Sequence, residues 1–292
     1  MKMLKKLIIL GAIIFFFGGT IHALEIEIKG GAGNMAFDDE AENALVTSGQ
    51  DYVPRHFPVA QINIKGDYSE LLDFSFRFER SPLLRSRALG LIGLNLKYGR
   101  FEIGPLIGIF NTKEQPLSAG ISGGIVLQYP GIIFGALRAS STLASPLSIS
   151  GDHIQSDGEA VIGFWVPNVI CSTSVNIKNF TCLMSDELLT RDTHIRYQVS
   201  ADVHSKNVPY TVRVDMGYQT LSRSYRSMGS TKTDELKSVY AGFEGTWRII
   251  PSLRFILGLE MPLYSWTGAP LKKYDPKMVL YQVQTGVILT FR

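Results

Sequence analysis

The most informative part of the chain is its last stretch, VLYQVQTGVILTFR at residues 279–292. Apolar side chains stand there at every second position except at Thr285: Val279, Tyr281, Val283, Val287, Leu289 and Phe291. The intervening positions are mostly polar: Gln282, Gln284, Gly286, Ile288 and Thr290. Because successive side chains of a strand point to opposite faces, this pattern predicts a β-strand with one apolar and one mostly polar face.

A two-faced strand that closes the chain on an aromatic residue resembles the C-terminal strand of bacterial outer-membrane β-barrels. The resemblance implies an assembly signal that the barrel-assembly machinery recognises, carried here by Tyr281, Val287, Leu289 and Phe291. Arg292 departs from the family pattern, because it places one residue after the terminal aromatic position.

The same alternation recurs along the chain, for example at residues 74–78, 195–203 and 210–218. Short connections alternate with longer ones at residues 33–57, 80–87, 111–116, 142–156, 178–192, 221–235 and 265–277. This order is typical of an all-β, transmembrane, antiparallel up-and-down barrel. A soluble β-sandwich is the alternative. The secretory signal at the N-terminus, described below, the aromatic terminal strand and the charged polar faces weigh against it.

Counting strands between the connections predicts fourteen, beginning near residues 24, 58, 71, 88, 101, 117, 131, 157, 169, 193, 208, 236, 252 and 278. The segment 179–189 leaves twelve or sixteen open, and a short helix around residues 185–189 is a further option. An even count places both chain ends in the periplasm. The expected location is the outer membrane of a Gram-negative or other diderm bacterium.

The N-terminus has the pattern of a secretory signal peptide, with a short membrane anchor as the alternative. Lys2, Lys5 and Lys6 precede an apolar run at residues 7–17, and small residues lead to a cleavage site after Ala23. The run is shorter than the ~18–20 residues that span a bilayer as a helix. We therefore expect a cleaved segment at 1–23 and one barrel domain at 24–292.

Composition and cysteine content exclude several classes. The formal net charge is +3 with both signs mixed along the chain, so no basic run predicts nucleic-acid binding. With two cysteines there is no disulfide framework. The topology places Cys171 at the periplasmic end of strand nine and Cys182 in the next extracellular loop, too far apart to form a disulfide.

Aromatic residues flank the predicted tight turns: Tyr98, Phe101, Tyr129, Phe164, Trp165, Tyr210 and Trp247. Their amphipathic rings favour the headgroup level, which predicts a periplasmic girdle. The alternative is the general preference of these residues for strands.

The polar faces carry the candidate pore-lining residues: Arg77, Glu79, Lys97, Arg196, Asp202, Arg213, Asp215, Glu244, Arg254 and Glu260. One interpretation is a water-filled lumen whose charges set an ion preference. The other is a narrow or plugged interior in which charge pairs fix the strand register. About eight strands give a filled interior and 16–18 an open channel, so fourteen predict a narrow pore.

Two loops add further hypotheses. The longest, at residues 33–57, could constrict the pore and carries an acidic cluster, Asp38, Asp39, Glu40 and Glu42, that suits a divalent cation or a solvated loop tip. The loop at residues 221–235 is basic, with Arg223, Arg226 and Lys232, and could contact host ligands.

Length and strand count resemble the small monomeric porins of the OmpG type, at the level of architecture only. The resemblance implies passive diffusion of small hydrophilic solutes or ions, with outer-membrane lipid and the assembly machinery as partners. The main alternative is an occluded barrel that acts as an adhesin through its loops. A hydrophobic-substrate transporter of the FadL type would be longer.

An outer-membrane enzyme is the remaining class. The triplet Asp202-Val203-His204 matches half of an omptin protease motif, but the predicted topology places it at the periplasmic end. No His-x-Ser pair suggests a phospholipase. The sequence therefore predicts no catalytic residue, cofactor or metal site.

Overall fold

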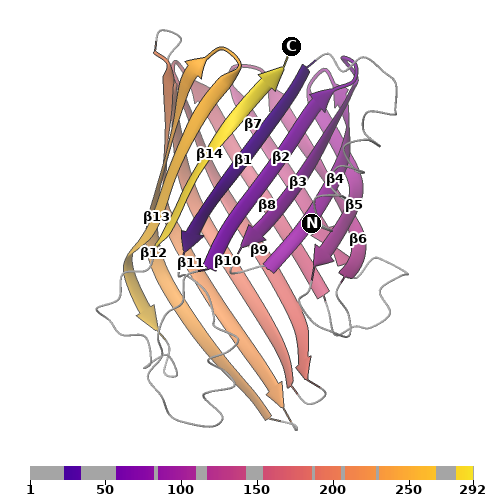
Figure 1. Cartoon of the computed structure of the whole chain (residues 1–292), viewed down its shortest axis with the longest axis vertical. Helices are drawn as coiled ribbons and strands as arrows, with labels where there is room; N and C mark the ends of the chain where they lie inside the picture. The colour runs from indigo at the N-terminus through magenta and orange to yellow at the C-terminus, as the bar shows by residue number, and fades with distance from the viewer. Residues whose placement is uncertain are drawn as a thin grey trace, which may run out of the picture.

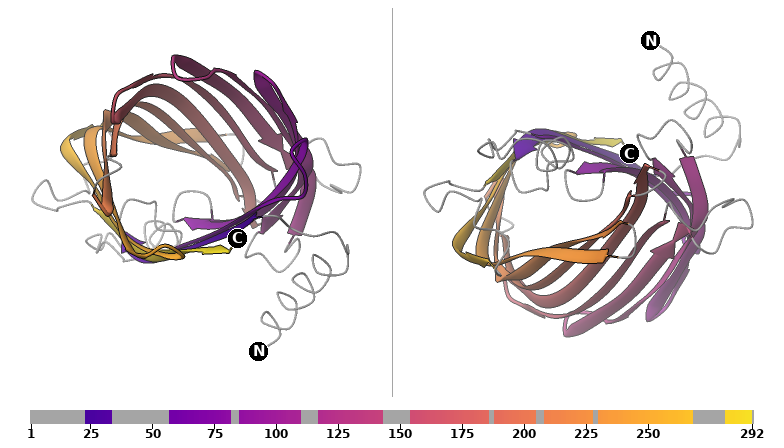
Figure 2. Two further views of the ribbon diagram at one scale, coloured as in Figure 1. Left: turned by 90° about the horizontal axis from the view of Figure 1, so that it is seen from above. Right: turned by 90° about the horizontal axis from the view of Figure 1, so that it is seen from below.

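The computed structural model describes residues 23–33, 57–81, 85–109, 117–142, 154–185, 188–204, 208–227, 230–267 and 281–291. Fourteen strands form a closed barrel in which every neighbouring pair is antiparallel and β1 closes onto β14 (Figures 1 and 2). They are β1 Ala23–Gly33, β2 Phe57–Asp67, β3 Leu72–Ser81, β4 Arg85–Leu96, β5 Gly99–Ile109, β6 Leu117–Tyr129, β7 Ile133–Ser141, β8 Ile154–Val166, β9 Val169–Ser185, β10 Leu188–His204, β11 Tyr210–Ser227, β12 Ser230–Ile250, β13 Leu253–Thr267 and β14 Gln282–Phe291. The predicted fold class and strand number are thus confirmed.

The seam between β1 and β14 pairs the two ends of the barrel sequence. Leu24 lies opposite Phe291, and Gly33 lies opposite Gln282. Within β14, Val283 and Phe291 are exposed on the outer surface, whereas Ile288 is buried on the inner face. The two-residue alternation of the terminal strand therefore sorts its side chains as the sequence predicts.

The two ends of the barrel differ. Every connection from an even-numbered to the next odd-numbered strand is short, and these turns lie at one end, with the start of β1 and the end of β14 (Figure 1). We call it the turn end and the opposite end the loop end. Residues 34–56, which hold the predicted acidic cluster and constricting loop, lie outside the described residues.

Large apolar side chains cover the outer surface. Among the most exposed are Leu137 at 65%, Ile92 at 63% and Val199 at 62%. A monomeric soluble protein rarely exposes a continuous apolar surface of this kind, whereas a barrel in lipid requires it. Within the described residues there is no helix long and apolar enough to cross a bilayer, a finding that concerns helical spans only.

The predicted aromatic girdle lies at the turn end with one exception. Tyr98 and Tyr129 stack on the outside with ring centroids 6.1 Å apart, and Phe164 and Trp247 are also exposed there. Trp165 instead packs against Phe134 on the inner face, with the two ring centroids 4.8 Å apart. Its assignment to the girdle was wrong, because consecutive residues of a strand cannot both face lipid.

Strands β9 to β12 extend farther than the other strands at the loop end. The outer face of β10, β11 and β12 is predominantly apolar over residues 195–203, 210–218 and 239–247, close to the ~9–11 residues that a tilted strand needs to cross a bilayer. Farther along, outward side chains are polar: Thr193 donates to Asn179 at 2.9 Å, and Lys237 pairs with Glu235 at 2.9 Å. We call the segments 179–185, 188–194, 219–227 and 230–238 the tall wall (Figure 1).

The tall wall corrects two predicted loops. Most of residues 178–192 and 221–235 forms paired strands, so the helix expected around residues 185–189 is wrong where the structure describes it. The reason is that these strands carry polar residues on both faces above the membrane. Arg223 is accordingly a buried wall residue, and Arg226 and Lys232 also lie in strands.

The cysteines lie on one strand. Cys171 and Cys182 both belong to β9, eleven positions apart, which is roughly 36 Å along a strand. Cys171 is a free thiol, as predicted, but Cys182 lies in a strand and not in a loop.

A charge on the lipid face provides a direct test of this arrangement. Replacing Leu137 with Arg should destabilise the folded barrel in lipid vesicles by roughly 2–4 kcal/mol, because the guanidinium would lie in hydrocarbon. Urea unfolding monitored by tryptophan fluorescence would measure the change. The control is Gln128→Arg, at an exposed inner-face position of neighbouring β6. Equal destabilisation of both variants would contradict the assigned lipid face.

Candidate functional site

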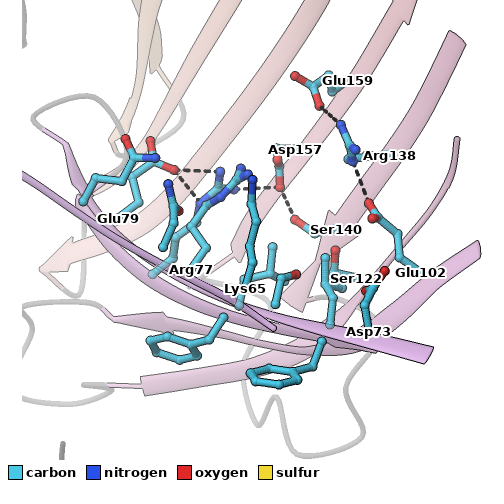
Figure 3. Close-up of a pocket in the computed structure, with 18 of the residues that line it drawn as sticks. Lys65, Asp73, Arg77, Glu79, Glu102, Ser122, Arg138, Ser140, Asp157 and Glu159 are labelled. Carbon is cyan, nitrogen blue, oxygen red and sulfur yellow. Dashed lines mark hydrogen bonds and ion pairs between the residues drawn. The ribbon is translucent and has the colours of Figure 1, made fainter. Parts of the chain in front are cut away.

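A polar cavity of about 380 Å³ lies against the inner face of β2 to β9 (Figure 3). Alternation along these strands brings the charged positions to one side of the sheet, so basic and acidic residues from six or more strands converge there. The basic members are Lys65, Arg77, Arg87, Arg100, Arg138 and Lys178. The acidic members include Asp73, Glu79, Glu102, Asp157 and Glu159.

Arg87 on β4 is the centre of one cluster in this cavity. Its guanidinium lies 2.9 Å from Glu79 and 2.8 Å from Asp157, and Lys178 reaches Glu79 at 3.3 Å. Asp157 also accepts a hydrogen bond from Ser140. The cluster links β3, β4, β8 and β9 across the cavity, so it fixes how these strands lie relative to one another.

A second chain of ion pairs runs beside it. Arg100 contacts Asp73 at 2.6 Å and Glu102 at 3.2 Å. Arg138 then contacts Glu102 at 2.6 Å and Glu159 at 3.0 Å (Figure 3). Positive and negative groups therefore alternate from β3 to β8, which lowers the net field of the paired groups.

The opposite part of the interior carries its own pairs. Arg196 contacts Glu260 at 2.8 Å, and its guanidinium lies 3.9 Å from the ring centroid of Tyr240. Arg213 contacts Asp215 at 2.9 Å. Two more pairs, Lys29 with Glu244 at 2.7 Å and Arg254 with Glu25 at 2.5 Å, connect the strands around the seam.

Several of these inward groups remain in contact with solvent. The side chains of Arg213 and Asp202 are 42% and 38% exposed, and that of Arg138 is 38% exposed. In a filled interior such pairs would be covered by neighbouring side chains. The exposed inward charges therefore indicate that water reaches the inner face at these positions.

The structure places nine of the ten candidate pore-lining residues on the inner face. They are Arg77, Glu79, Arg196, Asp202, Arg213, Asp215, Glu244, Arg254 and Glu260. Lys97 is the exception and a correction: it lies in the turn between β4 and β5, with its ammonium 5.2 Å from the ring centroid of Tyr98. A turn residue has no fixed inner or outer face, so alternation could not place it.

Sequence analysis missed several members of the clusters. Arg87, Lys178 and Asp192 were assigned to loops, and Arg100 to a turn. Arg223 is nearly buried beside Asp192, with contacts of 2.5 and 2.6 Å between guanidinium and carboxylate. The alternation Thr190, Asp192, His194, Arg196, if followed beyond the membrane length, would have revealed the inward position of Asp192.

The Asp202-Val203-His204 triplet lies at the turn end of β10, where the topology predicts it. The backbone amide of His204 donates to the carbonyl of Asn168 at 2.8 Å, and Asp202 lies 3.9 Å from Arg213. The Asp202 carboxylate is thus part of the inner ion-pair arrangement.

No protein-family model and no curated protein match the sequence. Among solved structures, it resembles an outer membrane channel from Pseudomonas putida F1, with TM-score 0.46, 6% identity and coverage of 92% of this chain and 95% of that one. It also resembles a porin, with TM-score 0.42, 9% identity and coverage of 93% of this chain and 100% of that one. A third similar structure is a loop-deletion mutant of OmpT, an outer membrane protein of Vibrio cholerae, with TM-score 0.40, 8% identity and coverage of 94% of this chain and 99% of that one. These identities are too low to assign a role to any residue.

The class of protein follows from the fold. A closed antiparallel barrel of fourteen strands, with an apolar outer surface and a charged inner face, has the architecture of an outer-membrane β-barrel.

Proposed function

We propose that the protein is a porin-like channel for passive diffusion of small hydrophilic solutes or ions across the outer membrane. The observation that carries the proposal is the partial exposure of inward charged side chains, Arg138, Asp202 and Arg213, around a polar interior. A barrel of fourteen strands encloses more space than a barrel of ~8 strands, whose interior is filled by side chains. Water between these charges would give a narrow conducting path.

The proposed orientation has the turn end in the periplasm and the loop end outside the cell. Short turns on the periplasmic side and long connections outside are the general arrangement of such barrels. Both termini are then periplasmic, which fits an N-terminal leader at 1–23 and recognition of β14 by the assembly machinery. Lipid would surround the apolar band, and the tall wall would stand above the outer surface.

Single-channel recording of the refolded mature protein in a planar bilayer tests the channel. We expect stable, step-like openings. Replacing Arg196, Arg213 and Arg254 together with Gln should shift the ion preference toward cations, because Glu260, Asp215 and Glu25 would remain without their partners. The reversal potential in a salt gradient measures the shift.

The matched pair is Arg213→Gln alone and Lys97→Gln, since each removes one positive charge, the first inside the barrel and the second from the turn between β4 and β5. Silence from a protein that is folded and heat-modifiable would overturn the channel. The tall wall favours one second candidate in that case, an occluded barrel that binds partners at the cell surface, because it presents hydrogen-bonded polar strands beyond the lipid.

A further inference from the structure

Lys65 and Arg77 differ from the other basic residues around the cavity. Each of those others lies 2.6–3.3 Å from a carboxylate: Arg87, Arg100, Arg138 and Lys178. For Lys65 and Arg77, the part of the chain that the structure describes provides no ion-pair partner, although both line the cavity. Two positive charges thus face the interior with carboxylates in electrostatic range, Glu27 for Lys65 and Glu79 for Arg77, but without an ion pair to either within the described residues.

Strand register places these two residues together. Lys65 on β2 lies opposite Ser75 on β3, and Arg77 is two positions farther along β3 on the same face. Such diagonal neighbours have Cβ atoms within about 7–8 Å of one another. Figure 3 shows both side chains rising from this part of the wall into the cavity, so their long side chains can reach one ligand.

Two of the carboxylates nearby are engaged by other cations, whereas Asp67, two positions from Lys65 on β2, also lines the cavity. Glu79 binds Arg87 and Lys178, and Asp73 binds Arg100 and accepts a hydrogen bond from Asn95. Their charges are therefore largely offset where they lie. Lys65 and Arg77 together carry one positive charge more than Asp67 offsets, so an anion that enters the cavity would meet a net positive charge there.

Asn63 adds an acceptor to the same cavity. It lies opposite Arg77, is 8% exposed, and its Nδ2 donates to Glu27 at 3.2 Å. Its Oδ1 is buried and accepts no hydrogen bond from the described residues. A buried acceptor of this kind is unfavourable unless a donor reaches it, and a hydroxyl group of a ligand would be such a donor.

We propose that Lys65 and Arg77 form a subsite for a small solute with an oxyanion group, a phosphate or carboxylate, and with hydroxyl groups beside it. The guanidinium offers paired N–H donors that match two anionic oxygens, and the ammonium adds a mobile positive charge. The hydroxyl groups would donate to Asn63. The subsite rests on the proposed channel function, because the solute must reach the cavity through the barrel.

Binding of inorganic phosphate to the refolded mature protein, measured by phosphorus NMR line broadening in detergent micelles, tests the subsite. We expect Lys65→Gln and Arg77→Gln each to weaken binding roughly fivefold, the effect of one nearby charge in a water-rich site. The double variant should lose about twentyfold. Lys97→Gln should bind as the wild type does, and acetate should compete if the site accepts carboxylates.

The channel and the subsite can fail separately. Phosphate binding that depends on Lys65 and Arg77 in a protein without conductance would overturn the channel and support the subsite. Conductance with unchanged phosphate binding in the double variant, or with no phosphate binding in the wild type, would overturn the subsite. Heat-modifiable migration of each variant establishes that the barrel is folded.

Discussion

Replacement of Arg223 with Ala is expected to destabilise the protein by about 3–5 kcal/mol, because it removes the guanidinium that forms two close contacts with the buried Asp192 carboxylate. The two side chains are only 4% and 10% exposed, and two contacts of 2.5 and 2.6 Å join them. Since the pair lies in the tall wall, hydrogen exchange should rise first in β10 and β11. Urea unfolding in detergent micelles measures the total effect.

Arg254→Ala is the matched control for that experiment. It breaks a pair of the same chemistry with Glu25, but both side chains are about one-third exposed. Solvent-accessible pairs contribute only about 0–1 kcal/mol. Adding Asp192→Asn to the Arg223→Ala variant should recover part of the lost stability by removing the buried charge. Equal losses for Arg223→Ala and Arg254→Ala would contradict the predicted importance of burial.

Replacement of Phe291 with Ser is expected to remove most of the protein from the outer membrane of expressing cells. Phe291 ends β14 at the seam, opposite Leu24, and its ring is 51% exposed on the outer surface. If the assembly machinery recognises the aromatic end of the terminal strand, the variant will not be inserted and will be degraded. Membrane fractionation and immunoblotting measure the loss.

The control separates recognition from stability. Phe255 on neighbouring β13 also faces outward, at 39% exposure, so Phe255→Ser removes a similar lipid contact without changing the terminal strand. Both variants should refold from urea into detergent to similar extents, because the backbone pairing of β1 with β14 remains. Comparable membrane levels of the two variants in cells would contradict the assembly signal.

The barrel was predictable because, wherever a strand crosses lipid, every second side chain faces outward and must be apolar. The alternation of apolar and polar residues therefore marks the strand in the sequence. In β11, the segment 210–218 must be apolar on its outer face, so its strand could be recognised from sequence. At residues 219–227 the lipid constraint ends, and the strand continues with polar residues on its outer face. Hydrophobicity then no longer separates a strand from a loop, which explains why both the tall wall and the Arg223–Asp192 pair were missed.

The interior was predictable only as a set of inward positions. Alternation placed Arg196, Arg213 and Glu260 on the correct face, but partners on distant strands depend on register and on the curvature of the barrel. Arg138, for example, bridges Glu102 and Glu159, residues 36 and 21 positions away. That no described carboxylate forms an ion pair with Lys65 could likewise be seen only in the folded structure, because acidic residues lie close to Lys65 in sequence.

Because the strands are unequal in length, the two sides of the barrel differ in height at the loop end. On the side of β1 to β8, strands of 9–13 residues end near the membrane surface, whereas β9 to β12 continue for 17–21 residues. The rim of the barrel at the loop end is therefore higher on the side of β9 to β12 than on the side of β1 to β8. In the proposed orientation, antibodies and phages that approach from the side of β9 to β12 would contact the tall wall first. Solutes that approach from the side of β1 to β8 would have a shorter path to the outer mouth.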